Sequence, residues 1–296
     1  MEAQHVVVIG AGAAGRAAAD ELVRSGWRGP VTIVEPAASA NRTLVSKGVL
    51  PGLLTPEQTH RPAPEGVESL HDHAVSVLAG PAVVLASGAE LRPAAVLIAS
   101  GSRPRELSDG LRLTRPSRLT TLHSASDALR VRDWLPLRDA RALVLGAGLV
   151  GSEAASVLAE HGVAVTLVSA SPLPLRTQLG PEVASALVER HRQAVETRFG
   201  RHVLGVDGGR DAIRVELDRG EFLEADVAVV AYGTVPLRPW FLGTEEGAIP
   251  VDGRLRTPVR GVYAAGGVAS VHDGPSQTRV DHWEDAEAQG RHAARA

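Results

Sequence analysis

Three glycines near the start of the chain have a spacing that suits phosphate binding. The apolar run 5–9 predicts a buried parallel strand, and the alanine-rich stretch that follows the glycines predicts a helix. A second apolar run, "VTIVE", predicts another strand. Glycines between a strand and a helix allow close approach of a pyrophosphate, and an acid ending the next strand can bind ribose hydroxyls. The pattern predicts a dinucleotide-binding site formed by Gly10, Gly12, Gly15 and Glu35.

The same pattern returns later, in "RALVLGAGLVGSEAASVLAEHGVAVTLVSAS". Its glycines are Gly146, Gly148 and Gly151. Ser169 stands where an acid would favour NAD(H), so the repulsion that excludes a 2′-phosphate is absent. Ser171 and Arg176 lie close enough in sequence to help bind such a phosphate. This favours NADPH slightly and leaves NADH open.

One ammonium group stands out among the charged residues. Lysine and arginine together number 31, and Lys47 is the only lysine. Abundant alanine and arginine are typical of GC-rich coding, so Lys47 is either a surviving surface residue or a group kept for its chemistry.

The chain has no cysteine, which excludes disulfides, thiolate nucleophiles and cysteine-ligated iron or zinc.

The composition predicts a globular protein with two domains. A chain of 296 residues with 44% hydrophobic residues exceeds one ordinary core. A net charge of −3 without a basic block, and 3% aromatic residues, argue against nucleic acid or an anionic membrane as partner. The start of the chain has no positive leader, so we expect a cytoplasmic protein. His71 and His73 could chelate a metal from a strand, but no third ligand is indicated, and we expect none.

Two dinucleotide sites in one chain suggest a flavin facing the nicotinamide that reduces it. With these motifs the chain resembles the FAD-dependent NAD(P)H reductases of ferredoxins and rubredoxins, which share the fold of the pyridine nucleotide-disulfide oxidoreductases and are related to apoptosis-inducing factor. "LIASGSRPR" with Gly101 and "AYGTVP" with Gly233 resemble the family's crossings between domains. "GVYAAGGVAS" and "VDHWEDAEAQGRHAARA" resemble its closing FAD strand and helix, in which Trp283 would pass beside the flavin.

The resemblance also implies a role for the lone lysine. The family carries an arginine and a Ser-Lys pair after the first acid, matched here by Arg42, Ser46 and Lys47. There the lysine lies near flavin N5 and pairs with a glutamate of the second fingerprint helix, matched by Glu153. The resemblance therefore implies that Lys47 and Glu153 form the catalytic ion pair.

Three departures from the family pattern set further expectations. The closing FAD motif usually reads Gly-Asp, whose carboxylate binds the ribityl chain, but here it is Gly266-Gly267. His123 falls where the family often has an arginine that contacts FAD. The chain ends where a family member would continue into a third domain. We therefore expect weakened FAD binding, and we expect Gly267→Asp to strengthen it about ten- to a hundredfold.

These observations predict an α/β fold of two interleaved doubly wound domains. The FAD-binding domain is expected at 1–112 and 238–296, and the NAD(P)-binding domain at 113–237. The predicted function is hydride transfer from NAD(P)H to FAD, then electron transfer to a small carrier protein or an organic acceptor. The alternative is a degenerate nucleotide-binding module that acts as a redox sensor, scaffold or partner subunit without turnover. The sequence predicts no oligomeric state.

Overall fold

The chain forms two compact units, each built from separate stretches of sequence. The computed structural model describes residues 4–36, 40–107, 111–115, 117–241, 247–274 and 276–296. Unit 1 consists of Met1–Asn41, His60–Arg103 and Thr234–Ala296, and unit 2 of Arg42–Thr59 and Pro104–Gly233. The second unit thus consists of two stretches inserted in the sequence of the first, as expected for interleaved domains.

Unit 1 is built on a five-stranded parallel sheet. Its strands, in spatial order, are β21 (Val262–Ala264), β7 (Ala95–Ile98), β1 (Val6–Ile9), β2 (Val31–Glu35) and β3 (Glu68–His71). The inner strands are continuous apolar runs because both faces of a parallel sheet are covered, and Val7 and Val8 are fully buried. The strand predicted at the start of the chain and the one predicted near its end lie in this one sheet, which confirms the predicted interleaving.

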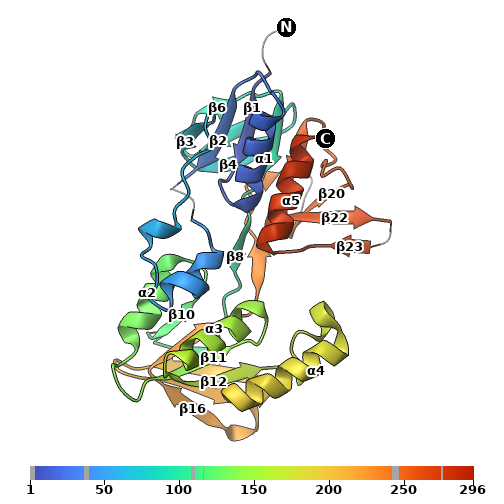
Figure 1. Ribbon diagram of the computed structural model, residues 1–296. Helices are drawn as coiled ribbons and strands as arrows, with labels where there is room; N and C mark the ends of the chain where they lie inside the picture. The colour runs from blue at the N-terminus through green and yellow to red at the C-terminus, as the bar shows by residue number, and fades with distance from the viewer. Residues whose placement is uncertain (1–3, 37–39, 108–110, 116, 242–246, 275) are drawn as a thin grey trace. The chain divides into compact units, whose positions relative to one another are not determined.

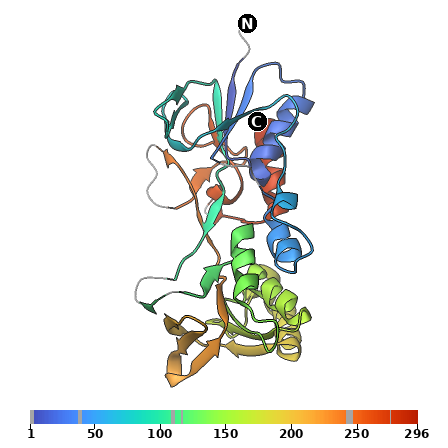
Figure 2. The ribbon, with the colours of Figure 1, turned by 90° about the vertical axis from the view of Figure 1, so that its left-hand side faces the viewer.

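Smaller sheets complete unit 1. One consists of β19 (Trp240–Phe241), β4 (Ala74–Leu78), β5 (Ala82–Leu85) and β6 (Glu90–Leu91). Another consists of β20 (Ile249–Val251), β22 (Ala269–Asp273) and β23 (Ser276–Thr278). Two short strands that carry the chain from one unit to the other, drawn as extended segments in Figure 2, pair with each other: β8 (Ser102–Pro104) and β18 (Thr234–Pro236).

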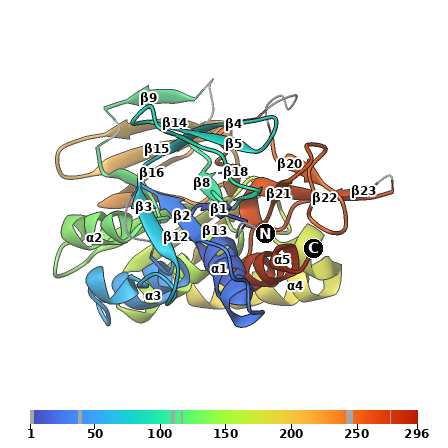
Figure 3. The same cartoon turned by 90° about the horizontal axis from the view of Figure 1, so that it is seen from above.

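Two helices with small residues at their contact pack side by side in unit 1 (Figures 1 and 3). They are α1 (Ala13–Arg24) and α5 (Trp283–Ala294). A Cβ added to Gly290 of α5 would lie 2.1 Å from the carbonyl oxygen of Ala14 in α1. No other residue type could stand at this contact without moving the helices apart, so the glycine sets how closely they pack.

Unit 2 repeats the five-stranded parallel arrangement. Its strands, in order, are β10 (Leu119–Thr121), β17 (Val227–Val230), β11 (Arg141–Leu145), β12 (Ala164–Ser169) and β13 (Glu196–Phe199). Its helices are α2 (Ala125–Trp134), α3 (Leu149–Glu160) and α4 (Arg176–Ala194). Helix α3 packs on β11 and β12. A second sheet consists of β16 (Phe222–Ala225), β15 (Ile213–Leu217), β14 (Val203–Gly208) and β9 (Arg112–Thr114).

The segment that contains Lys47 belongs to unit 2 by its packing. It includes a π-helical turn, Val45–Val49, and a short 3-10 turn, Glu57–Thr59. Val45 and Val49 are buried in one apolar cluster with residues of α2 and α3. Contacts therefore group this segment with unit 2, whereas the predicted domain bounds, 1–112 with 238–296 and 113–237, stay a prediction. The assignment of one domain to FAD and the other to NAD(P) stays a prediction.

A stability prediction follows from the contact between helix and strand in unit 1. A Cβ on Gly15 would lie 1.9 Å from the carbonyl oxygen of Gly10. We expect Gly15→Ala to lower the free energy of unfolding by about 1–3 kcal/mol, despite the better helix propensity of alanine, because the overlap forces the helix off the turn. Gly253→Ala is the control, since nothing lies within 4 Å of its added Cβ. Thermal melting followed by circular dichroism compares the two, and equal midpoints would contradict the prediction.

Candidate functional site: two dinucleotide cradles and an ion pair

The first glycine turn is held by its own backbone. Gly10 follows β1 with a φ of 99°, and its N–H donates to the carbonyl oxygen of Val34 over 2.8 Å. A Cβ at Gly10 would lie 2.6 Å from the carbonyl oxygen of Ala99. The left-handed backbone and the close approach both require glycine here. The turn thus places the start of α1 directly beyond the carboxyl end of β1.

The second glycine turn has the same construction. Gly146 follows β11 with a φ of 109°, and its N–H donates to the carbonyl oxygen of Val168 over 2.8 Å. A Cβ at Gly146 would lie 2.4 Å from the carbonyl oxygen of Ala231, and one at Gly151 would lie 1.9 Å from that of Gly146. The two predicted fingerprints are therefore structural duplicates, one in each unit.

The middle glycine of each turn has open surroundings, unlike the other two. Gly12 and Gly148 are the N-caps of α1 and α3, and neither helix has a side-chain cap or an acid in its first turn. No atom lies within 4 Å of an added Cβ at either position. The glycines therefore leave room for a ligand to approach the helix N–H groups, which attract anions. Both turns fit a dinucleotide pyrophosphate.

The residues that end the second strand of each turn differ in charge. Glu35 ends β2 and Ser169 ends β12, and both are buried. The Ser169 hydroxyl accepts a hydrogen bond from the N–H of Ser171 over 3.2 Å. Arg176 is exposed at the start of α4. The acid predicted to bind ribose thus ends β2 of unit 1, and a neutral hydroxyl takes the corresponding position in unit 2.

Two arginines near Ser169 are held by acids of their own unit. The Arg201 N–H donates to the carbonyl oxygen of Ser169, but its guanidinium binds Asp218 and Glu221. Hydrogen bonding to Asp218 raises the pKa of Arg201, and hydrogen bonding to Glu221 raises that of Arg198. Because these guanidinium groups already have carboxylate partners, they are poor candidates for binding a 2′-phosphate.

The predicted ion pair is present within unit 2. Lys47 Nζ donates to Glu153 Oε2 over 2.6 Å, which joins the turn Val45–Val49 to α3. The side chains are 58% and 31% exposed. Glu153 Oε1 is buried and has no hydrogen-bond partner among the described residues. The sequence therefore identified both members and their pairing, whereas their place relative to a bound flavin stays a prediction.

The remaining predicted residues occupy defined positions, and their roles stay predictions. Gly101 and Gly233 both have positive φ, and their carbonyl oxygens accept from the N–H groups of Leu237 and Arg105. Arg42 is exposed at the start of its segment in unit 2. His123 is partly buried in unit 2, and its backbone N–H donates to Asp127.

The closing segment of unit 1 is ordered by side chains of α5. The N–H of Gly266, which has a φ of 76°, donates to Gln289 Oε1 over 2.8 Å. Trp283 donates from its indole nitrogen to Glu287 over 2.9 Å, and the Arg61 guanidinium lies 5.5 Å from the centre of its ring. The tryptophan is thereby fixed on two sides.

A cluster of polar side chains at Gly267 was not predicted from the sequence. It comprises Ser102, Thr234, Arg279 and Asp281, which are joined by hydrogen bonds. Arg279 Nε also donates to the Gly267 carbonyl oxygen over 2.7 Å. The only signal in the sequence was the acid of "VDHW", which gives no indication of a contact with residue 267.

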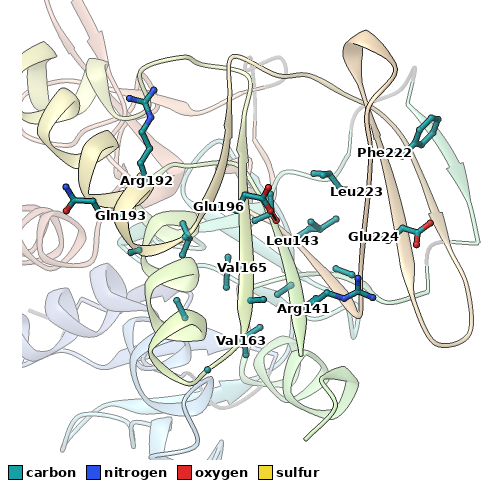
Figure 4. Close-up of a pocket in the computed structure, with 18 residues that line it drawn as sticks. Arg141, Leu143, Val163, Val165, Arg192, Gln193, Glu196, Phe222, Leu223 and Glu224 are labelled. Carbon is teal, nitrogen blue, oxygen red and sulfur yellow. Dashed lines mark hydrogen bonds between the residues drawn. The ribbon is translucent and has the colours of Figure 1, made fainter. Parts of the chain in front are cut away.

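One depression of unit 2 lies away from the glycine turns. It has a volume of about 850 Å3 and lies at the amino-terminal ends of β11 and β12, between α4 and β16 (Figure 4). Arg141 and Val163 line it, together with Glu196 of β13. Ligands of open α/β sheets bind at the carboxyl ends of the strands, which is the opposite end from this depression.

Within the described ranges, no three His, Cys, Asp or Glu residues gather in a group that could hold a metal ion. None of the helices in that same part of the chain is long and apolar enough to cross a membrane.

The chain is similar to proteins of one family over nearly its whole length. A family model described as pyridine nucleotide-disulphide oxidoreductase matches residues 4–290. Apoptosis-inducing factor 3 of Homo sapiens is 30% identical over 309 residues, which covers 98% of this chain and 50% of that protein. The ferredoxin–NAD(+) reductase subunit of the benzene 1,2-dioxygenase system of Pseudomonas putida is 29% identical over 316 residues, with 99% and 74% covered.

The fold also matches that of one chain in a solved complex. The covalent putidaredoxin reductase–putidaredoxin complex matches with a TM-score of 0.85 and 24% identity, over 99% of this chain and 75% of that one. This likeness concerns the fold. The chain spans half the length of the first relative named above and about three quarters of the second.

Substituting alanine for Gly12 or Gly148 should weaken the binding of one nucleotide and not of the other. Both positions are N-caps with similar backbone angles and open surroundings, so each change should cost the fold no more than about 1 kcal/mol. We expect Gly12→Ala to weaken FAD binding by about tenfold or more and to leave NAD(H) binding within about threefold, and Gly148→Ala to do the reverse. Flavin fluorescence and calorimetry measure the two affinities. Equal losses of both ligands in either variant would contradict the assignment.

Proposed function

Because the chain belongs to the pyridine nucleotide-disulphide oxidoreductase family, we propose that it is an FAD-dependent NAD(P)H oxidoreductase of the ferredoxin reductase type. It passes hydride from NAD(P)H to FAD, and electrons then go to a small electron-carrier protein or an organic acceptor. The carrier is supported by relatives whose names include ferredoxin and putidaredoxin. The observation that carries the proposal is the duplicated glycine turn, one in each unit. A cytoplasmic location, expected from the sequence, is part of the proposal.

In this proposal FAD binds unit 1. Gly10, Gly12 and Gly15 form the turn for its pyrophosphate, and the buried Glu35 is the acceptor for its ribose hydroxyls. Ser100, which follows β7 beside Gly10, has a buried hydroxyl without a hydrogen-bond partner in the described part of the chain. Buried polar groups usually have partners, so this hydroxyl also suits a polar ligand.

The nicotinamide nucleotide binds unit 2. The neutral Ser169 neither repels a 2′-phosphate nor offers a carboxylate to the ribose, and the arginines at 198 and 201 are engaged elsewhere. We therefore expect weak discrimination, with NADH used at least as well as NADPH. The relatives named as ferredoxin–NAD(+) reductases support NADH.

The ion pair provides a fixed positive charge for the chemistry. Bound FAD supplies a ring that accepts hydride and releases electrons one at a time. Glu153 holds the Lys47 ammonium in one place, and a preorganised cation stabilises negative charge that develops during reduction. Because a carboxylate holds the ammonium in place, it needs none of the reorganisation that a solvated lysine would need.

A second candidate function follows from Gly267. Without a carboxylate on this residue, FAD binding could be too weak for turnover, and the chain would act as a redox sensor, scaffold or partner subunit. The two candidates differ in whether bound flavin is reduced. One experiment therefore separates them.

An anaerobic titration tests the proposed function. Purified protein is loaded with FAD, separated from free flavin, and titrated with NADH and in parallel with NADPH. We expect loss of the oxidised flavin absorbance with one equivalent of NADH per FAD, since one hydride carries two electrons. Protein that binds FAD but is reduced by neither nucleotide would favour the binding module. Protein that retains no FAD would contradict the assignment of FAD to unit 1 and would likewise favour the module without turnover.

Lys47→Ala tests the ion pair. We expect the variant to slow flavin reduction by about tenfold or more, equivalent to about 1.4 kcal/mol of transition-state stabilisation, with the dissociation constant for NAD+ changed by less than about threefold. Lys47→Arg is the control because it keeps the charge opposite Glu153. Stopped-flow reduction measures the rates. Identical rates in the wild type and Lys47→Ala would make Lys47 a surface residue with no part in the chemistry.

A further inference from the structure

The space next to Gly267 is taken by a carboxylate from elsewhere in the chain. A Cβ added to Gly267 would lie 2.5 Å from Asp281 Oδ1 and 3.1 Å from Asp281 Cγ. Real Cβ atoms essentially never approach other atoms so closely. The Asp281 carboxylate therefore occupies the space that a side chain on residue 267 would need.

Asp281 is held in this position by three side chains of unit 1. Its Oδ2 accepts from Ser102 Oγ over 2.7 Å, from Thr234 Oγ1, and from Arg279 Nη2 over 3.2 Å. Arg279 also donates to the Gly267 carbonyl oxygen. Hydrogen bonds from several donors fix the orientation of a carboxylate and favour its charged form. The three donors all reach Oδ2, so it is Oδ1 that is directed at Gly267.

The carboxylate is also accessible. The Asp281 side chain is 31% exposed, whereas a purely structural carboxylate with three donors could be fully buried. A partly exposed and oriented acceptor suits a ligand with hydroxyl groups, because a charged acceptor strengthens the hydrogen bonds that such groups donate. Gly267 lies in the short turn Gly266–Val268, which directly follows β21 of the parallel sheet. It therefore lies at the end of the sheet where ligands bind.

We propose that Asp281 supplies the carboxylate that Gly267 lacks, and that it accepts hydrogen bonds from the ribityl hydroxyls of FAD. This inference rests on the proposed function, since it needs FAD in unit 1. Under this inference the FAD affinity is not weakened by the glycine at position 267, because Asp281 provides the carboxylate. Ser102 and Arg279 are positioning residues, which act by orienting Asp281.

The relocated acid reverses the expectation for Gly267→Asp. An aspartate at 267 would place its Cβ against the carboxylate of Asp281 and bring two negative charges together. We now expect this substitution to leave FAD binding unimproved or to weaken it. Tighter binding was expected from the sequence because residue 267 lacks a carboxylate there. The sequence does not show that the Asp281 carboxylate lies beside it.

The test is an exchange of the carboxylate between the two positions. FAD dissociation constants are measured on FAD-free protein by flavin fluorescence at one pH and salt concentration. We expect Asp281→Ala to weaken FAD binding about ten- to a hundredfold, and Asp281→Asn, which keeps an acceptor oxygen without charge, to weaken it less. In the double variant Gly267→Asp/Asp281→Ala, we expect affinity to return to within about tenfold of the wild type. Asp252→Asn is the matched control, since Asp252 also pairs with an arginine of unit 1.

Each outcome decides the inference. Wild-type affinity in Asp281→Ala, or tighter binding in Gly267→Asp alone, would overturn it. Thermal melting of the FAD-free variants shows whether they fold, and Asp281→Asn serves where the alanine variant does not. Wild-type protein that binds no FAD would overturn the proposed function as well. If the wild type binds FAD and is reduced by NADH while Asp281→Ala does the same unchanged, only this inference fails.

Discussion

The contact between the last glycine and the first glycine of each turn is the constraint on which the rest of the molecule depends. In both units the third glycine lets the helix backbone contact the carbonyl oxygen of the first glycine. A Cβ on the third glycine would lie only 1.9 Å from that oxygen. This contact fixes the start of the helix beyond the carboxyl end of the strand. It therefore determines where the unpaired N–H groups of the helix point, and with them where a phosphate can bind.

The two units keep this geometry and differ in the residues around it. In unit 1 the second strand ends in an acid, Glu35, whereas in unit 2 it ends in Ser169. Packing requires the first and third glycines in both units, and only the middle ones are free of such contacts. The shared part suits a dinucleotide pyrophosphate in both units, and the proposed assignment of a different nucleotide to each unit rests on the residues that differ.

Local patterns were sufficient to predict the sheets and the turns. Apolar runs such as 5–9 and the glycine spacings specify strands and cradles from neighbouring residues, and the structure agrees. The resemblance to a family also predicted the contact between Lys47 and Glu153, which are 106 residues apart. The packing of residues 42–59 in unit 2 was not predicted, because it depends on Val45 and Val49 meeting α2 and α3.

The relation of Gly267 to Asp281 shows why a motif alone can mislead. Ser102 and Asp281 are 179 residues apart, and no periodicity or spacing in either segment indicates that they meet at a third position. A glycine in place of an acid looks like a loss as long as only the motif is considered. In three dimensions the Asp281 carboxylate occupies the space beside Gly267, so the two positions are coupled.

The energetics of the Lys47–Glu153 pair argue for a role in chemistry over one in stability. Half-exposed ion pairs contribute only about 0–1 kcal/mol, partly because two long side chains lose conformational freedom. The turn that carries Lys47 is already held by buried valines, so it does not need the pair for its position. The Lys47 charge thus adds little to the stability of the fold. The second oxygen of Glu153 is buried and has no hydrogen-bond partner in the described structure. Such an arrangement suits a site that a bound ligand completes.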